Sequence, residues 1–163
     1  MQRYIDPIGQ VDEIEEKSRR VLVWGAVLFL VGLIEGLFIP YFTNPRMGLS
    51  AHLSAVQGGM ALLIIGLAWQ RLQLSFTQLR YTYYFNVAGM VIIWLSLTLA
   101  AVLGTSQATP IAGAGFEGSA IAEGIVQGML TLGAIAAIVG GALFFWGLEL
   151  TTWPGKKKRD PSA

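Results

Sequence analysis

The chain of 163 residues has no cysteine and a single histidine, His52. The lack of cysteine excludes disulfides, zinc thiolate sites, iron–sulfur clusters and thiolate nucleophiles within the chain. With one histidine, few metal sites are left. An imidazole near the mouth of a membrane helix is costly to desolvate and versatile as an acid, a base or a metal ligand, so His52 is the first functional candidate.

Charge is also scarce. Only 13% of the residues are charged, whereas 54% are hydrophobic and 20 are glycine, a composition that is not typical of a soluble domain. The apolar residues form four blocks, about 21–42, 49–69, 81–103 and 120–148. Each block is long enough to cross a hydrocarbon core about 30 Å thick. The sequence therefore predicts an all-α fold, an integral membrane four-helix bundle spanning residues 21–149.

The cations are distributed asymmetrically between the ends of these blocks. Of the 11 Lys and Arg residues, only Arg46 lies in a connection on the far side. The positive-inside rule then places both termini in the cytoplasm of a multi-pass inner or cell membrane protein. Residues 1–20 are predicted to be a cytoplasmic helical arm without a removable signal peptide, and residues 150–163 a basic tail that contacts membrane lipid. The net charge of +1 gives no reason to expect nucleic acid.

His52 lies about one turn into the second block. Ala55 and Gly59 share its helical face, so the surface beside the imidazole is predicted to be nearly flat. Such a surface suits a porphyrin, and a single histidine ligand would leave the opposite face of a haem iron open to substrate. The residues alone leave two interpretations open, a haem ligand or a capped interfacial histidine.

Further polar residues are predicted in the outer half of the bilayer. Glu35 should be protonated, paired with Arg46 or exposed to a wet cavity, because an isolated buried carboxylate is costly. Gln57 lies deeper than His52 on the same helix. Glu123 and Gln127 are four residues apart and share a face, where they orient substrate or close the helix packing.

The connection between the first and second blocks lies on the outer side. Pro45 and Gly48 interrupt the first turn, and Ser50 is predicted to cap the helix that follows. In the fourth block, Gly124 and Gly128 have the small-xxx-small spacing of close helix contacts. Packing within one subunit and packing between subunits are both open.

The motifs around these residues resemble a known family. Residues 44–53 read Asn-Pro-Arg-Met-Gly-Leu-Ser-Ala-His-Leu and are followed by Gly59-Met60; residues 110–116 read Pro-Ile-Ala-Gly-Ala-Gly-Phe; the last block closes on Trp146-Gly147-Leu148. These segments resemble the hydroxylaminobenzene mutases, which are related to the styrene oxide isomerases. The resemblance implies a homotrimer that binds haem b, with His52 as the axial ligand. Two positions depart from the family pattern, Gly58 in place of an asparagine and the acid Glu35.

The resemblance implies a redox-neutral isomerase in which ferric haem acts as a Lewis acid on a small apolar aromatic substrate from the bilayer. The leading prediction is rearrangement of an arylhydroxylamine to an aminophenol, and the alternative is conversion of an aryl epoxide to an aldehyde. Arg46 is the candidate partner of a haem propionate. From other classes, a small proton-coupled multidrug-type transporter that uses Glu35 and a haem protein for sensing or electron transfer remain as rivals.

Overall fold

The computed structural model describes residues 7–149, with side chains from residue 14 onward, and this part of the chain is entirely helical apart from its connections. Four long helices follow one another: α1 (Pro7–Gly36), α2 (Pro45–Ala68), α3 (Phe76–Leu103) and α4 (Ala120–Glu149). Two short 3₁₀ helices, η1 (Ile39–Tyr41) and η2 (Trp69–Arg71), lie before and after α2. The predicted all-α fold is confirmed.

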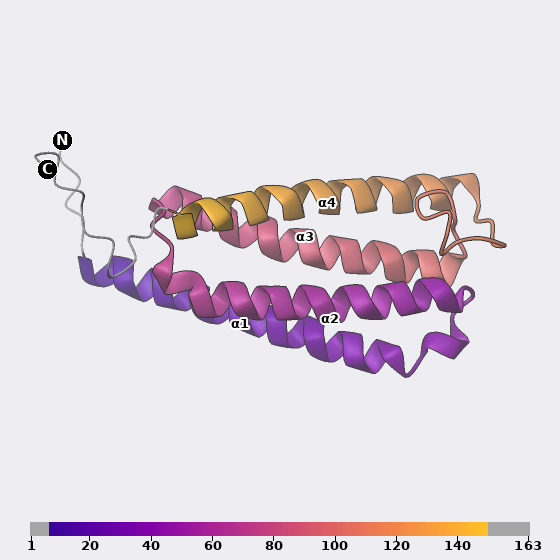
Figure 1. Ribbon diagram of the computed structural model, residues 1–163, viewed down its shortest axis with the longest axis horizontal. Helices are drawn as coiled ribbons and strands as arrows, with labels where there is room; N and C mark the ends of the chain where they lie inside the picture. Colours follow the sequence, from indigo (N-terminus) through magenta and orange to yellow (C-terminus); the bar gives the residue numbers. More distant parts are fainter. Residues whose placement is uncertain (1–6, 150–163) are drawn as a thin grey trace, which may run out of the picture.

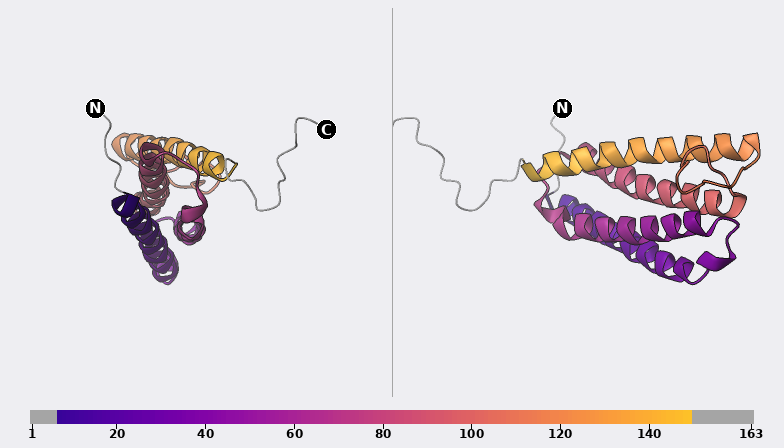
Figure 2. Two further views of the ribbon diagram at one scale, coloured as in Figure 1. Left: turned by 90° about the vertical axis from the view of Figure 1, so that its left-hand side faces the viewer. Right: turned by 45° about the vertical axis from the view of Figure 1, so that its right-hand side comes forward.

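The four helices form two packed pairs. α1 lies against α2 along its length, α3 lies against α4, and α2 joins the pairs through its contact with α3 (Figure 1). The end-on view in Figure 2 shows α4 resting on α3 and standing apart from α1. Because the chain turns back three times, α1 begins and α4 ends at the same end of the molecule (Figure 1). We call this the terminal end, and the opposite end, which holds the α1–α2 and α3–α4 connections, the loop end.

Local capping residues determine where the helices begin and end. The side chain of Asn44 accepts hydrogen bonds from the backbone N–H groups of Arg46 and Met47, and Pro45 occupies the first helical position of α2, where proline is favoured. Ser75 and Gln78 form a capping box at the start of α3, and Gly104 ends that helix in the left-handed conformation at φ 65°. The prediction that Ser50 caps α2 was wrong, since its hydroxyl lies inside the helix and donates to the carbonyl of Arg46.

Three of the helices in residues 7–149 are long and apolar enough to cross a membrane: Pro45–Arg71, Phe76–Leu103 and Ala120–Glu149. The chain is a membrane protein on this evidence. In α1, Arg20 and Glu35 bound the apolar stretch, which is shorter than the roughly 20 residues that a membrane span needs. A fourth span and the cytoplasmic location of both termini stay predictions.

The predicted boundaries differ from the structure at the loop end. The first block was predicted to continue to residue 42, but α1 ends at Gly36 and a short 3₁₀ turn follows. Residues 7–20 of the predicted arm are helical as expected, yet they continue directly into the apolar part of α1. Residues 1–6 and the predicted basic tail at 150–163 lie outside the described residues.

Candidate active site

His52 lies in the contact between α2 and α1 near the loop end. Its Nδ1 atom is 2.7 Å from the carbonyl oxygen of Gly32 on α1, and the side chain is half-buried. A carbonyl oxygen can only accept, so Nδ1 is the donor in this contact, and in a neutral imidazole the proton is therefore on Nδ1. The other nitrogen, Nε2, then keeps its lone pair. This is the arrangement typical of a metal-bound histidine, in which a backbone carbonyl fixes the tautomer and the ring orientation.

Two glycines of α1 let α2 and its imidazole lie close to α1. A Cβ at Gly36 would lie 2.9 Å from Nδ1 and 3.0 Å from Cε1 of His52. A Cβ at Gly32 would lie 2.7 Å from the Cβ of Ala55 and would push the two helices apart. The four-residue spacing of Gly32 and Gly36 places both on one face of α1, and that face meets His52.

The expected flat surface beside His52 is not open. Ala55 is fully buried, and Gly59 packs so closely on α1 that a Cβ there would lie 2.5 Å from the backbone nitrogen of Phe29. The prediction that these small residues form a surface for a porphyrin is therefore wrong for the single chain. Their small size instead allows α1 and α2 to approach each other. The helical face was predicted correctly, but α1 covers it.

Glu35 lies in the same part of α1 but is directed to α3. Its Oε2 accepts from the indole N–H of Trp94 at 2.8 Å, and its Oε1 accepts from the hydroxyl of Thr98 at 2.7 Å. The residue is 8% exposed. No ion pair with Arg46 forms among the described residues, because Arg46 donates instead to the carbonyl oxygen of Ala114. Glu35 thus joins α1 to α3, while His52 joins α2 to α1, and the two side chains do not meet.

The α3–α4 connection, residues 104–119, folds over the loop end and is held by two buried polar side chains. Glu123, which is 2% exposed, accepts from the backbone N–H groups of Ser106 (2.9 Å), Gln107 (2.9 Å) and Gly118 (3.1 Å). Asn44, which is fully buried, donates from Nδ2 to the carbonyl of Ala112 at 3.1 Å. Glu123 is therefore a structural residue of the connection, in agreement with the packing alternative considered for it.

Gln57 and Gln127 are both exposed and do not contact His52. Gln57 borders a groove of about 430 Å³ between α2 and α3, together with Ser50, Leu53, Ser54, Gly58, Ala61, Met90 and Ile93. Five residues separate it from His52, a rotation of about 140° around the helix, so the two side chains lie on different sides of α2. Although Glu123 and Gln127 share a helical face by spacing, only Glu123 is buried. One chain therefore does not bring the predicted polar residues together in a single site: these are His52, Arg46, Glu35, Gln57, Glu123 and Gln127.

The contacts of His52 and Arg46 show whether these residues could hold a haem. Among the described residues, no group of three or more His, Cys, Asp or Glu side chains could hold a bare metal ion. A haem needs only one axial ligand from the protein, and His52, oriented by Gly32 with a free Nε2, meets that requirement. The predicted Arg46 contact to a propionate has no support from the geometry, because the guanidinium is engaged by the α3–α4 connection.

Comparison with known proteins defines the class. The styrene oxide isomerase family model matches residues 17–149, a range that includes all four helices and His52. The chain belongs to this family. It is a membrane isomerase.

Two proteins of known activity are similar to this chain and indicate its place within the family. The chain is 37% identical over 147 residues to hydroxylaminobenzene mutase HabB of Ectopseudomonas oleovorans, covering 90% of this chain and 88% of that protein. It is 36% identical over 107 residues to hydroxylaminobenzene mutase HabA of the same organism, covering 65% and 79%. No solved structure matches the chain. The resemblance inferred from the motifs is confirmed.

Gly32, Gly36 and Trp94 belong to the site but were not predicted from the sequence. A signal for the glycines exists in their four-residue spacing, but similar spacings occur elsewhere in this glycine-rich chain. No signal in the sequence identifies Trp94 as the donor to Glu35, because that contact joins residues 59 positions apart.

Proposed function

We propose that the protein is a haem-dependent mutase that rearranges an arylhydroxylamine to an aminophenol. The observation that carries the proposal is the 2.7 Å contact between Nδ1 of His52 and the carbonyl of Gly32, which leaves Nε2 free to bind iron. The similarity to two hydroxylaminobenzene mutases supports the choice of substrate.

The reaction needs no external oxidant or reductant. The N–O bond of the substrate breaks, a C–O bond forms at the ring, the ring carbon loses its proton, and the nitrogen gains one. Bound haem would supply a ferric iron that withdraws electrons from the substrate oxygen. The isomer has the same atoms as the substrate.

Each residue of the chain near His52 has a distinct part. His52 would hold the cofactor, Gly32 would fix the direction of its ring, and Gly36 would leave the space that the ring occupies. Glu35 holds α1 on α3 through Trp94 and Thr98. The apolar helices exclude bulk water and so limit capture of a cationic intermediate. This assignment moves Glu35, Gln57, Glu123 and Gln127 out of direct catalysis.

The architecture we propose follows the family resemblance. It is a homotrimer in the inner membrane with four spans and with both termini in the cytoplasm. The transporter interpretation of Glu35 is not retained, because the family is enzymatic and both carboxylate oxygens are engaged by neighbouring side chains.

The test begins with the absorbance spectrum of the protein purified in detergent. We expect a Soret band that is lost in His52→Ala, while Thr131→Ala, an exposed position on α4, retains it. Phenylhydroxylamine conversion, followed by chromatography of the aminophenol product, should be lost together with that band. A colourless, folded wild-type protein that still converts the substrate would overturn the role of haem.

A second candidate reaction is isomerisation of an aryl epoxide to an aldehyde. The name of the matching family, styrene oxide isomerase, supports this candidate. Styrene oxide should be assayed beside phenylhydroxylamine with the same haem-loaded preparation. Faster turnover of styrene oxide would select the epoxide reaction. If neither compound rearranges, the proposed chemistry is wrong even if His52 binds haem.

A further inference from the structure

A second cavity lies far from His52, near the terminal end of the helices. It has a volume of about 310 Å³ and is lined by Arg19, Arg20, Val23 and Trp24 of α1 and by Tyr83 of α3. α1 and α3 have few contacts with each other, and α4 does not cover this space. The cavity is therefore an open slot between two helices.

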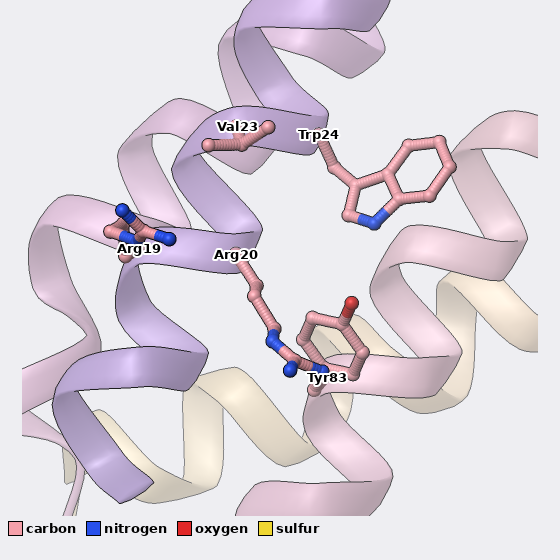
Figure 3. Close-up of a pocket in the computed structure, with 5 residues that line it drawn as sticks. All are labelled: Arg19, Arg20, Val23, Trp24 and Tyr83. Atoms are coloured by element: carbon pink, nitrogen blue, oxygen red, sulfur yellow. The ribbon is translucent and has the colours of Figure 1, made fainter. Parts of the chain in front are cut away.

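Three hydrogen-bond donors are directed into this slot. Figure 3 shows the indole nitrogen of Trp24 and the hydroxyl of Tyr83 facing each other across the gap, with the guanidinium of Arg20 beside Tyr83. Within the described residues, neither the indole N–H nor the phenol O–H has a hydrogen-bond partner. Arg20 donates one hydrogen bond, at 2.5 Å, to Glu16, whereas a guanidinium has five N–H donors. The slot thus has donor capacity that the protein does not use.

The charge of the slot and its depth along α1 restrict the kind of ligand that fits. Arg19 and Arg20 are the last cations before the apolar part of α1; Glu16 pairs with Arg20, and Arg19 has no ion pair among the described residues, so the two arginines together keep a positive charge beside the slot. Val23, 55% exposed, and Trp24, 42% exposed, lie one turn further along, in the direction of the apolar stretch. A fitting ligand combines an anionic head at the arginines with a hydrocarbon chain along Val23 and Trp24.

We propose that this slot binds one anionic phospholipid, with the headgroup phosphate at Arg20, Tyr83 and Trp24 and an acyl chain along Val23. Guanidinium groups bind phosphate oxygens through paired N–H donors, and tryptophan and tyrosine favour the headgroup level of a bilayer. A zwitterionic lipid carries the same phosphate but its own cation offsets the charge, so the slot prefers the anionic lipid. The haem and substrate chemistry is not part of this proposal.

The experiment measures quenching of Trp24 by brominated lipid in vesicles that contain the full-length protein. Subtracting the signal of Trp24→Phe isolates this tryptophan from the others. We expect brominated phosphatidylglycerol at low mole fraction in phosphatidylcholine to quench Trp24 well beyond its share of the lipid, and brominated phosphatidylcholine to quench only in proportion. Arg20→Gln should weaken the preference about ten-fold, since it removes a hydrogen bond between charged groups, which contributes about 1.5 kcal/mol.

Two further variants and one competitor complete the test. Tyr83→Phe removes only the hydroxyl and should give a smaller loss, which keeps the proposal testable if Arg20→Gln fails to fold. Arg80→Gln removes an equal charge on α3 outside the slot and should leave the preference unchanged. Equal quenching by the two lipids, or equal losses in Arg80→Gln and Arg20→Gln, would overturn the site. Displacement of the lipid by inorganic phosphate at millimolar concentration would identify a phosphate site and overturn the lipid assignment.

Discussion

Glycine serves opposite purposes in two regions of this protein. In the α1–α2 contact, a Cβ at Gly25, Gly32, Gly36 or Gly59 would come within 3.0 Å of atoms of the facing helix. On the outer face of α4, a Cβ at Gly124, Gly128 or Gly141 would have no atom within 4 Å. The first group sets the distance between two helices and the position of His52. The second group faces nothing in the single chain, so identical residues in similar spacings have unrelated structural roles.

The strongest test of the contrast is Gly59→Ala. Its Cβ would lie 2.5 Å from the backbone nitrogen of Phe29 and 2.8 Å from the carbonyl oxygen of Gly25, and backbone atoms cannot yield as a flexible side chain can. We expect a loss of about 3 kcal/mol in the free energy of unfolding, at the upper end for an overpacked core. Thermal unfolding in detergent measures it. A variant as stable as the wild type would show that α1 and α2 are not held at this distance.

Glu123→Gln tests the polar anchor by which α4 holds the α3–α4 connection. An amide nitrogen in place of Oε2 would face the N–H donor of Gln107, and the charge that strengthens the other two hydrogen bonds would be lost. We expect a destabilisation of about 2 kcal/mol, the usual range for hydrogen bonds to a charged group. Glu117→Gln, an exposed acid in the same connection, is the control and should change little. Equal effects of the two substitutions would contradict the anchor.

Gly36→Ala separates a local effect on His52 from a loss of the fold. The added Cβ would lie 2.9 Å from Nδ1 and would displace the imidazole from its contact with Gly32, and the three nearest atoms across the contact all belong to this one side chain. If His52 binds haem as proposed, we expect about a ten-fold loss of haem affinity, as for other changes to the residues that orient a metal ligand. Haem titration followed at the Soret band measures this, and the unfolding temperature should stay near that of the wild type. Unchanged affinity would mean that the Gly32 contact does not orient the ligand.

The helical class could be predicted, and His52 could be singled out as a candidate, because both inferences depend on local properties of the sequence. Long apolar blocks specify helices whatever their partners, and a lone histidine in such a block stands out by itself. The predicted helix boundaries were wrong where capping residues determine them. Pro45 was interpreted as a break, but Asn44 caps the helix and Pro45 is the first residue of α2.

Partners between helices could not be predicted from the sequence. Glu35 was expected near Arg46 and instead binds Trp94 and Thr98, because helix pairing and rotation decide which side chains meet. The apolar residues surround each membrane helix on all sides, so their pattern does not reveal the rotation. Ala55 and Gly59 illustrate the same limit, since their small size was recognised but the helix that covers them was not.

The smallest expected effect, and one of opposite sign, belongs to Gly128→Ala on α4. Alanine favours a helix over glycine by about 1 kcal/mol, and a Cβ at this position meets no atom of the chain. In the isolated chain the substitution should therefore raise the free energy of unfolding by about 0.5–1 kcal/mol, in contrast to the loss at Gly59. Unfolding should be measured at several protein concentrations in detergent, together with the particle mass. A loss of stability accompanied by a smaller particle would show that this face of α4 packs against a second copy, and that both groups of glycines serve close contact after all.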